Sequence, residues 1–327
     1  MSQRSLVEPG EPLGEPVSTS RKFAGLRWVR RLVTLAAVLT VAAVVVPDST
    51  VKPTQMELVK INRATGLDYP KGNKDIVWIL AVGSDARPGE DMTRVRGDAL
   101  QLVGMNLRTG AATAIGVPRD SWVPIPGYGS NKINAALYFG GPQALGQAVG
   151  NLVGIQPDYV FVTRFKFFQA LIGSIGGIDI RNPRRFVDPD LKPEGFDAGR
   201  LHLGPYDAMV FARIRYGLAS GDFDRSANQQ RVLRGIQAKI RARASEAGFL
   251  ENGVLNVMQY LHTDLPPTEL FQLAQAVAQV DPAKVTSCVV QGGIGNIGGA
   301  SVVLPYTGQA RRLGDRARND ATLESCS

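Results

Sequence analysis

Residues 76–87 read IVWILAVGSDAR, and this stretch decides how the rest of the sequence is interpreted. Its first part, from Ile76 to Val82, is a continuous apolar run, which is typical of a strand buried on both faces of a sheet. Gly83 ends the run, and two charged residues, Asp85 and Arg87, follow it directly. Because α/β folds place ligand-binding residues at the ends of such strands, Asp85 is the first candidate for a functional site.

Apolar periodicity and turn residues predict an alternation of strands and helices after residue 73. We expect long loops at 182–203, which is polar and proline-containing, and at 292–299, which is rich in glycine. No linker-like stretch divides residues 73–320, so the pattern indicates one three-layer α/β/α domain with a central mixed sheet. The expected strands are 76–82, 99–106, 112–116, 159–163, 178–180 and 285–290, and the expected helices are 133–139, 142–153, 165–175, 205–211, 224–246, 253–261, 267–280 and 306–318.

A short apolar run near the N-terminus predicts a membrane anchor. Arginines at 27, 30 and 31 precede the uncharged run Leu32–Val46, and Asp48 follows it. This asymmetry places the N-terminus in the cytoplasm and the later residues outside. A cleaved signal peptide is the main alternative, although Val44–Val46 stands where small residues precede cleavage. We therefore expect a single-pass protein of the cell membrane, with a disordered cytoplasmic tail (1–25), an anchor (26–47), a stalk (48–72) and an extracytoplasmic domain (73–327).

Composition narrows the class of ligand. The chain carries a formal charge of +8, with 44% hydrophobic and 20% charged residues, which is ordinary for a globular protein that binds an anion or an anionic membrane surface. No helix-turn-helix, zinc-finger or aromatic RNA-binding pattern is present, so no nucleic acid partner is expected. With two histidines and two cysteines, a His-rich zinc site or a thiol-based site is improbable. Cys288 and Cys326 form either a disulfide or a buried thiol and a free one.

Arginine, aspartate and glutamine gather in a few short clusters, each beside an apolar or glycine-containing segment. Guanidinium forks bind phosphate oxygens two at a time, and carboxylates are ligands for hard divalent cations. The combination therefore predicts chemistry on a phosphate or pyrophosphate group. The clusters are Gly83-Ser84-Asp85-Ala86-Arg87, Arg94-Val95-Arg96-Gly97-Asp98, Val117-Pro118-Arg119-Asp120, and Arg213-Ile214-Arg215 followed by Asp222-Phe223-Asp224-Arg225 and Gln229-Gln230.

These clusters, together with Lys132-Ile133-Asn134-Ala135-Ala136 and Gly140-Gly141, occur in an order that resembles the LytR-CpsA-Psr family of bacterial cell-wall proteins. The resemblance covers about residues 74–240 and the anchor topology. It implies a Mg²⁺-dependent phosphotransferase outside the membrane. Such an enzyme moves a glycopolymer from its polyprenyl-pyrophosphate carrier onto peptidoglycan through a phosphodiester bond.

The resemblance also implies roles for individual residues. Asp85 and Asp98 would hold Mg²⁺, with Asp98 also counted among the catalytic residues. Two departures from the family pattern, Gly97 and Asn228, leave substrate preference open. The expected pyrophosphate-binding residues are Arg96, Arg119, Lys132, Arg213, Arg215, Arg225 and Gln229, of which Arg96, Arg119 and Arg215 would be catalytic.

The sequence allows alternative roles for several of these residues. The arginines could form surface salt bridges instead, and Asp120 could simply orient Arg119. Arg213 and Arg215 would share one face if their stretch is extended, whereas Arg225 and Gln229 would share a helix face. A polyprenyl tail needs an apolar channel, which sequence does not distinguish from an ordinary core; its candidate residues are Leu137, Phe139, Val160, Phe161, Phe165, Phe168 and Leu171.

Two other functions remain compatible with the same residues. A non-catalytic binder or scaffold of polyprenyl-linked precursors would use the arginines without turnover and would not need paired metal carboxylates. A lipid pyrophosphatase would need an activated water in place of a sugar acceptor. The identity of the glycopolymer is not encoded in these motifs.

The anchor leads to a prediction about topology. A reporter that is active only outside the cytoplasm should be active when fused after Ser327 and silent when fused before Arg21, because the basic residues before Leu32 stay on the cytoplasmic side. Reporter activity in cells measures both fusions. The reverse pattern would contradict an extracytoplasmic function.

Overall fold

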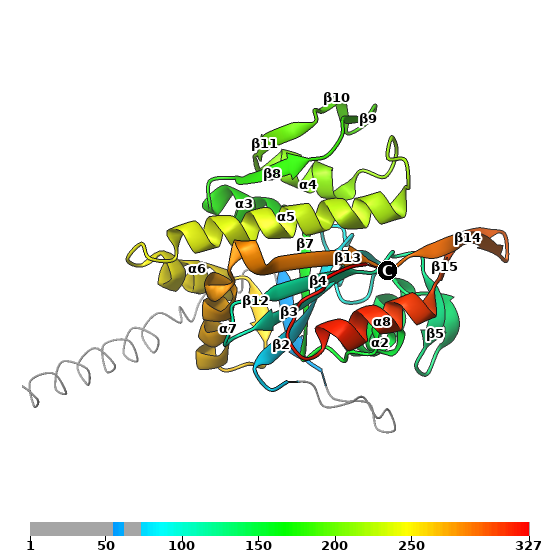
Figure 1. Cartoon of the computed structure of the whole chain (residues 1–327), viewed down its shortest axis with the longest axis horizontal. Coiled ribbons are helices and arrows are strands. Elements are labelled where there is room, and N and C mark those ends of the chain that lie inside the picture. Colours follow the sequence, from blue (N-terminus) through cyan, green and yellow to red (C-terminus); the bar gives the residue numbers. More distant parts are fainter. Residues whose placement is uncertain (1–54, 62–72, 327) are drawn as a thin grey trace, which may run out of the picture. The chain divides into compact units, whose positions relative to one another are not determined.

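The computed structural model describes residues 55–61 and 73–326 (Figure 1). The predicted cytoplasmic tail and anchor, and most of the predicted stalk, lie outside the described residues. Within the described part, no helix is both long enough and apolar enough to span a membrane.

The core of the fold is a seven-stranded sheet. Its order is β12-β1-β7-β2-β3-β4-β13. Three neighbouring pairs are parallel (β1 with β12, β2 with β7, β4 with β13) and the other three are antiparallel, so the expected mixed sheet is confirmed. The strands are β1 (Met56–Lys60), β2 (Ile76–Ser84), β3 (Gly97–Asn106), β4 (Ala112–Gly116), β7 (Tyr159–Arg164), β12 (Leu261–Thr263) and β13 (Val285–Val289).

Strand β2 occupies the centre of this sheet, as its apolar sequence predicts. Its even-numbered residues, including Trp78 and Leu80, are buried on one face, whereas the alternate residues on the other face are only half buried. The expectation of burial on both faces is therefore correct for one face only. The ring of Trp78 lies directly over Gly104 of β3, where a Cβ atom would come within 2.5 Å of it, so this close approach requires glycine.

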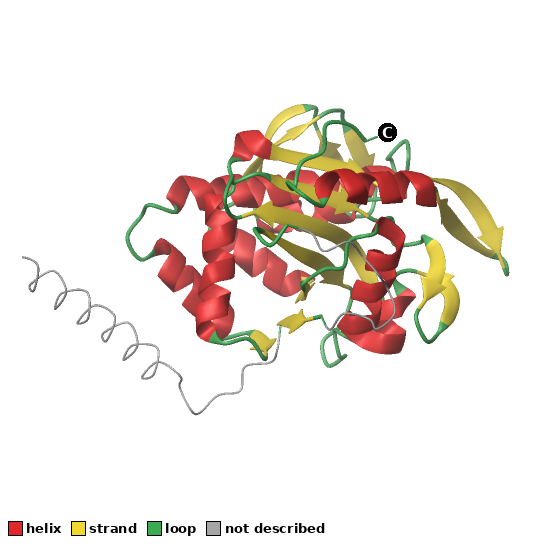
Figure 2. Ribbon diagram, turned by 60° about the horizontal axis from the view of Figure 1, so that its bottom comes forward, coloured by secondary structure: helices red, strands yellow, loops and turns green. Residues whose placement is uncertain are grey.

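Helices cover both faces of the sheet and form the expected three layers (Figure 2). On one face, α2 (Ala135–Val153) and α8 (Thr307–Ala317) pack against the buried residues of β2 and β3. The other face is covered by α3 (Phe165–Ser174), α4 (Pro205–Arg213), α5 (Asp222–Arg243) and α7 (Pro267–Gln279), with α6 (Phe249–Met258) against α7. A short 3-10 helix, η1 (Pro282–Lys284), precedes β13.

Hairpins replace the two predicted loops. Residues 182–203 contain β9 (Phe186–Asp188), β10 (Lys192–Phe196) and β11 (Gly199–Leu203), and β11 pairs with β8 (Ile178–Asn182). Residues 292–299 begin a hairpin of β14 (Gly292–Ile297) and β15 (Ala300–Pro305). The loop predictions were wrong because proline and glycine mask the alternation that marks a strand. Gly298 and Gly299 adopt the positive φ angles that the tight β14–β15 turn uses.

Strand β1 lies within residues 48–72, for which the sequence predicts a stalk. It pairs with β7 on one side and β12 on the other, and Met56 is buried. The folded part of the chain therefore begins before residue 73. A third hairpin, β5 (Trp122–Ile125) with β6 (Gly129–Lys132), was also not expected and leads into α2.

A disulfide joins Cys288 of β13 to Cys326, which decides between the two interpretations of these cysteines.

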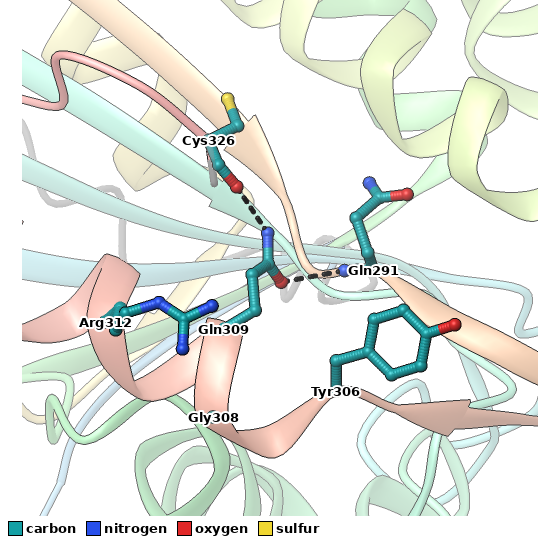
Figure 3. A pocket seen from close by; sticks show the side chains of 6 residues that line it. All are labelled: Gln291, Tyr306, Gly308, Gln309, Arg312 and Cys326. Atoms are coloured by element: carbon teal, nitrogen blue, oxygen red, sulfur yellow. Dashed lines mark hydrogen bonds between the residues drawn. The ribbon is translucent and has the colours of Figure 1, made fainter.

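Beside the disulfide is a broad, open depression of about 820 Å³, lined by Gln291, Tyr306, Gly308, Gln309, Arg312 and Cys326 (Figure 3). The amide of Gln309 donates a hydrogen bond to the carbonyl of Cys326 at 2.7 Å and accepts one from the backbone N–H of Gln291 at 3.0 Å. One polar atom of this amide thus holds the C-terminal segment and the other holds the connection between β13 and β14, which indicates a structural role for Gln309.

Candidate active site

Strand ends bring the first charged residues together. The end of β2, the start of β3 and the end of β4 lie at one edge of the sheet, because β3 is antiparallel to both neighbours. Asp85 follows β2, Asp98 is the second residue of β3, and Arg119 and Asp120 follow β4 by a few residues. A side chain of Arg119 donates a short hydrogen bond to Asp98. Three clusters that are far apart in sequence therefore meet at this edge.

Two more arginines approach from the segment between α4 and α5. Arg213 is the last residue of α4, so the stretch 213–215 is not an extended strand and the expected shared face does not form. Arg213 instead pairs with Asp85 at 3.6 Å, and its guanidinium lies over the ring of Phe165 at 4.3 Å. Arg215 pairs with Asp120 at 3.7 Å. The end of a helix thus directs these two arginines toward different carboxylates.

Asp120 links two cations. One carboxylate oxygen lies 3.1 Å from Nζ of Lys132, and the other lies 3.7 Å from Arg215. The sequence left open whether Asp120 orients Arg119, but the closest ion-pair partner of Arg119 is Asp98. Burial lowers the pKa of Arg119, yet the Asp98 and Asp120 carboxylates outweigh this effect and raise it. The guanidinium therefore keeps its charge although the side chain is only 25% exposed.

Helix α5 contributes a buried pair of Arg225, which the sequence assigned to pyrophosphate binding, and Asp222, to which it assigned no role. Arg225 donates a short hydrogen bond to Asp222, and both side chains are 6–7% exposed. Burial raises the pKa of Asp222, and the Arg225 guanidinium opposes the shift. Asp222 lies in the recognised motif, but its burial arises only when α5 packs on the sheet, so sequence provided no signal for its role.

The approach of α5 to the sheet depends on Gly116 at the end of β4. A Cβ atom there would lie 2.4 Å from Oγ of Ser226. Because Gly116 has no side chain, α5 lies close enough for Gln101 of β3 to donate hydrogen bonds of 3.0 Å to Ser226 Oγ and to Oε1 of Gln229. The amide nitrogen of Gln229 is directed to the backbone carbonyl of Ala212 at 3.2 Å. Gln229 shares the α5 face with Arg225, as expected, and its contacts position α4 and β3 relative to α5.

Several buried polar atoms of the site have no hydrogen-bond partner within the described residues. Among them are Nε of Arg119, Oδ1 of Asn134 and Oδ2 of Asp222. Buried polar atoms without partners are uncommon in folded proteins and are found at sites that bind ligands or water. Their chemistry, a donor beside two acceptors, suits a polar ligand with both oxygens and hydroxyl groups.

An apolar cavity of about 210 Å³ adjoins these charges on the α3–α5 side of the sheet. Asp98, Arg213, Arg225 and Gln229 contribute to its wall. Of the channel candidates, four line the cavity, namely Phe161, Phe165, Phe168 and Leu171. Leu137 and Val160 belong to the core under α2, and Phe139 packs against that core. The half-buried face of β2 lines the cavity through Ala81 and Gly83, which explains why that face is not fully covered.

The remaining arginines of these clusters do not line the cavity. Arg87, Arg94 and Arg96 are exposed in and beside the segment between β2 and β3. Arg94 donates a 3.2 Å hydrogen bond to the carbonyl of Phe139. Arg96 makes no hydrogen bond or ion pair with the part of the chain that the structure describes, so its predicted role depends on a ligand.

The carboxylates of Asp85 and Asp98 are the candidates for a metal. Burial raises the pKa of Asp85, and the neighbouring Asp98 carboxylate raises it further. Two carboxylates that repel one another fit a divalent cation, which would relieve the repulsion. Within residues 55–61 and 73–326, no group of three or more His, Cys, Asp or Glu side chains could hold a metal ion. A cation at this position would therefore need ligand or water oxygens as well.

The fold and site define a class of protein: an α/β domain with an anion-binding cluster beside an apolar cavity. The chain belongs to the LytR_cpsA_psr family, whose model matches residues 42–319. It is 28% identical over 228 residues to the polyisoprenyl-teichoic acid–peptidoglycan teichoic acid transferase TagU of Bacillus anthracis, covering 69% of this chain and 73% of that protein.

Solved structures share the fold. The Bacillus subtilis protein TagV matches with a TM-score of 0.63 and 24% identity, covering 75% of this chain and 97% of that one. B. subtilis TagT with bound octaprenyl pyrophosphate lipid matches with a TM-score of 0.60 and 21% identity, covering 84% and 99%.

The buried pair on α5 gives a prediction about stability. Asp222→Ala should lower the free energy of unfolding by about 3–5 kcal/mol, because it leaves Arg225 buried without a counter-charge. Asp197→Ala is the control: Asp197 pairs with Arg185 at 3.0 Å, but both are exposed, so the loss should be about 0–1 kcal/mol. Urea denaturation measures both variants, and equal losses would show that the α5 pair is not a buried charge pair in solution.

Proposed function

We propose that this chain is a phosphotransferase of the cell membrane, anchored by its N-terminal segment, whose catalytic domain acts outside the cytoplasm. It moves a glycopolymer from a polyprenyl-pyrophosphate carrier onto peptidoglycan through a phosphodiester bond. One observation carries the proposal: a single cavity has aromatic and aliphatic walls and also reaches Arg213, Arg225 and Asp98. A lipid pyrophosphate combines an apolar tail with a highly charged head, and this cavity offers a matching surface to each.

The names of the relatives support the same substrate class. The similar protein of B. anthracis is a teichoic acid transferase that joins a polyisoprenyl-linked polymer and peptidoglycan, and the TagT structure contains a polyprenyl pyrophosphate. Transfer outside the cytoplasm agrees with the disulfide between Cys288 and Cys326, since such bonds persist in oxidising compartments.

The arginines would act electrostatically. Arg213 and Arg225 are placed to bind the phosphate nearest the lipid, and Arg119, Arg215 and Arg96 to bind the phosphate that is transferred. A sugar hydroxyl of the acceptor attacks this second phosphorus, a new P–O bond forms, and the bond to the lipid phosphate breaks. The leaving lipid monophosphate takes the electron pair, and the proton of the attacking hydroxyl is released to water. Fixed positive charge stabilises the charge that develops on these oxygens.

Asp85 and Asp98 fit Mg²⁺, with substrate oxygens and water completing the shell. When bound, the cation would neutralise charge on the pyrophosphate. Lys132, held by Asp120, and Asn134 complete the polar surroundings of the phosphate and its first sugar. A scaffold protein would use the same arginines and a lipid pyrophosphatase the same arginines and carboxylates, and an assay that detects polymer on a sugar acceptor separates these two from the transferase.

The carboxylates are tested by removing each one. Asp85→Ala and Asp98→Ala should abolish transfer, because each removes a metal ligand, and a chelator should have the same effect on the wild type. Transfer of radiolabelled polymer from a polyprenyl pyrophosphate donor to peptidoglycan measures the loss. Asp75→Ala is the matched control, since Asp75 flanks the opposite end of β2 and pairs with Arg108 at 3.2 Å. Activity that survives chelation and both substitutions would refute the metal role.

Arginine-to-lysine changes test whether shape matters as well as charge. Arg119→Lys and Arg215→Lys retain the positive charge but lose the planar fork that binds two phosphate oxygens at once. Each should lower the turnover rate on the order of a hundredfold, because about 3 kcal/mol of transition-state stabilisation is lost.

Arg185→Lys, in an exposed ion pair, is the control and should retain full activity. Thermal unfolding of each variant is measured in parallel, because Arg119 also holds Asp98. Near-normal turnover in both stable lysine variants would refute binding of the phosphate by these forks.

A further inference from the structure

Three aromatic side chains gather where the β5–β6 turn meets the first turns of α2. Tyr128 stacks on Phe139 with ring centroids 5.6 Å apart and planes 15° apart. Tyr138 packs edge-on against the same ring at 5.5 Å. Tyr128 is 49% exposed and Tyr138 is 58% exposed. We call Tyr128, Tyr138 and Phe139 the aromatic platform.

The rings of the platform are held in place by close packing against the main chain. A Cβ atom at Gly140 would lie 2.8 Å from the ring of Tyr128, so this ring packs directly on the main chain. Gly141 has a φ of +66°, which kinks α2 immediately after the platform. Arg94 donates its hydrogen bond to the carbonyl of Phe139 and fixes the neighbouring segment. Rings held in this way lose little conformational entropy when a ligand binds.

Short stretches of chain connect the platform to residues of the candidate active site. Tyr128 precedes Lys132 by four residues in the β5–β6 hairpin, and Tyr138 follows Lys132 by six. The Arg94 segment continues directly to Arg96 and Asp98. Buried residues between these points, such as Ile133 and Leu137, anchor the connection to the core. The platform is therefore fixed in position relative to the phosphate-binding residues.

The platform and the lipid cavity lie on opposite sides of the sheet. Leu137, beside Tyr138, packs in the core under α2 with Val82 and Leu100, whereas the cavity is lined from α3, α4 and α5. Figure 1 shows β5 and α2 on the side of the sheet away from α3–α5. In a phosphoryl transfer the attacking and leaving oxygens are roughly in line. Because the leaving phosphate stays with the lipid on the α3–α5 side, the acceptor hydroxyl must approach from the α2 side.

The chemistry of the platform suits a glycan. The electron-rich face of an aromatic ring attracts the C–H groups on the flat face of a pyranose, and the tyrosine hydroxyls can exchange hydrogen bonds with sugar hydroxyls. Exposed aromatic clusters of this kind mark interaction sites on soluble domains. Arg94 adds one positive charge at the edge, which suits a strand that carries carboxylates.

We propose that the aromatic platform binds the acceptor glycan strand of peptidoglycan and presents its hydroxyl group to the phosphate. This proposal rests on the proposed transferase function. It assigns the acceptor to the α2 side of the sheet and the carrier lipid to the α3–α5 side, so the two substrates do not compete for one surface.

The test separates acceptor binding from donor binding. Tyr138→Ala and Tyr128→Ala are assayed in the full-length protein, with uncrosslinked strands of alternating N-acetylglucosamine and N-acetylmuramic acid as acceptor. The acceptor KM should rise about tenfold, the size expected for removal of an aromatic anchor, while the donor KM and kcat change little. Tyr138→Phe keeps the ring and should retain most of the acceptor affinity.

Tyr306→Ala is the matched control, because Tyr306 is also 58% exposed but lies beside the β14–β15 hairpin. It should leave the acceptor KM unchanged. An acceptor KM that stays normal in both platform variants would overturn the proposal, as would a rise in the donor KM alone, which would place the donor glycan there. An equal effect of Tyr306→Ala would move the acceptor site to that hairpin and overturn it as well.

Direct titration of the same glycan strands, without donor, distinguishes this proposal from the proposed function. If the wild type transfers no polymer but Tyr138→Ala weakens strand binding about tenfold, the transferase assignment fails and the platform remains a glycan-binding site. If the wild type transfers polymer and strand binding is unaffected by both platform variants, the platform proposal alone fails.

Discussion

Charge balance is the constraint on which the site depends. Positive side chains are costly to gather in a partly buried site unless carboxylates compensate them, and four of the cations here are paired with carboxylates from other segments of the chain. Asp98 holds Arg119, Asp85 holds Arg213, and Asp120 holds both Lys132 and Arg215. The carboxylates therefore fix the arginines in place before a ligand arrives, and a ligand phosphate would replace part of their role rather than create the geometry.

Buried polar residues under α5 also fix the site, because their hydrogen bonds hold this helix on the sheet. Gly116 allows the helix to approach β4, and a row of amides occupies the interface. Gln230 donates a 2.7 Å hydrogen bond to the carbonyl of Cys288, which ties the disulfide-linked strand β13 to the helix that supplies Arg225. The helix that carries Arg225 is consequently fixed to the sheet by side-chain hydrogen bonds, and this rigidity suits a site that must keep a phosphate in a fixed position.

The sequence predicted the elements whose structure follows from the pattern of residues within a single segment. The apolar run of β2, the residues that follow it and the long helix α5 follow from periodicity and from charged residues beside apolar segments. The hairpins at 182–203 and 292–305 did not, because their pairing partners supply the hydrogen bonds that proline- and glycine-rich stretches do not reveal. The cavity could not be predicted either: Phe161 lines it, Val160 next to it is core, and only the orientation of β7 separates them.

The pairing of β1 sets an order on folding. Met56 lies opposite Thr163 of β7 and Leu261 of β12, so β1 pairs with strands that are about 100 and 200 residues further along the chain. At synthesis rates of roughly 5–20 residues per second, the second partner appears some tens of seconds after the first strand. Until then β1 presents unpaired backbone groups, and sheets built from such distant contacts form slowly. This side of the sheet therefore cannot be completed until residues 261–263 have been synthesised.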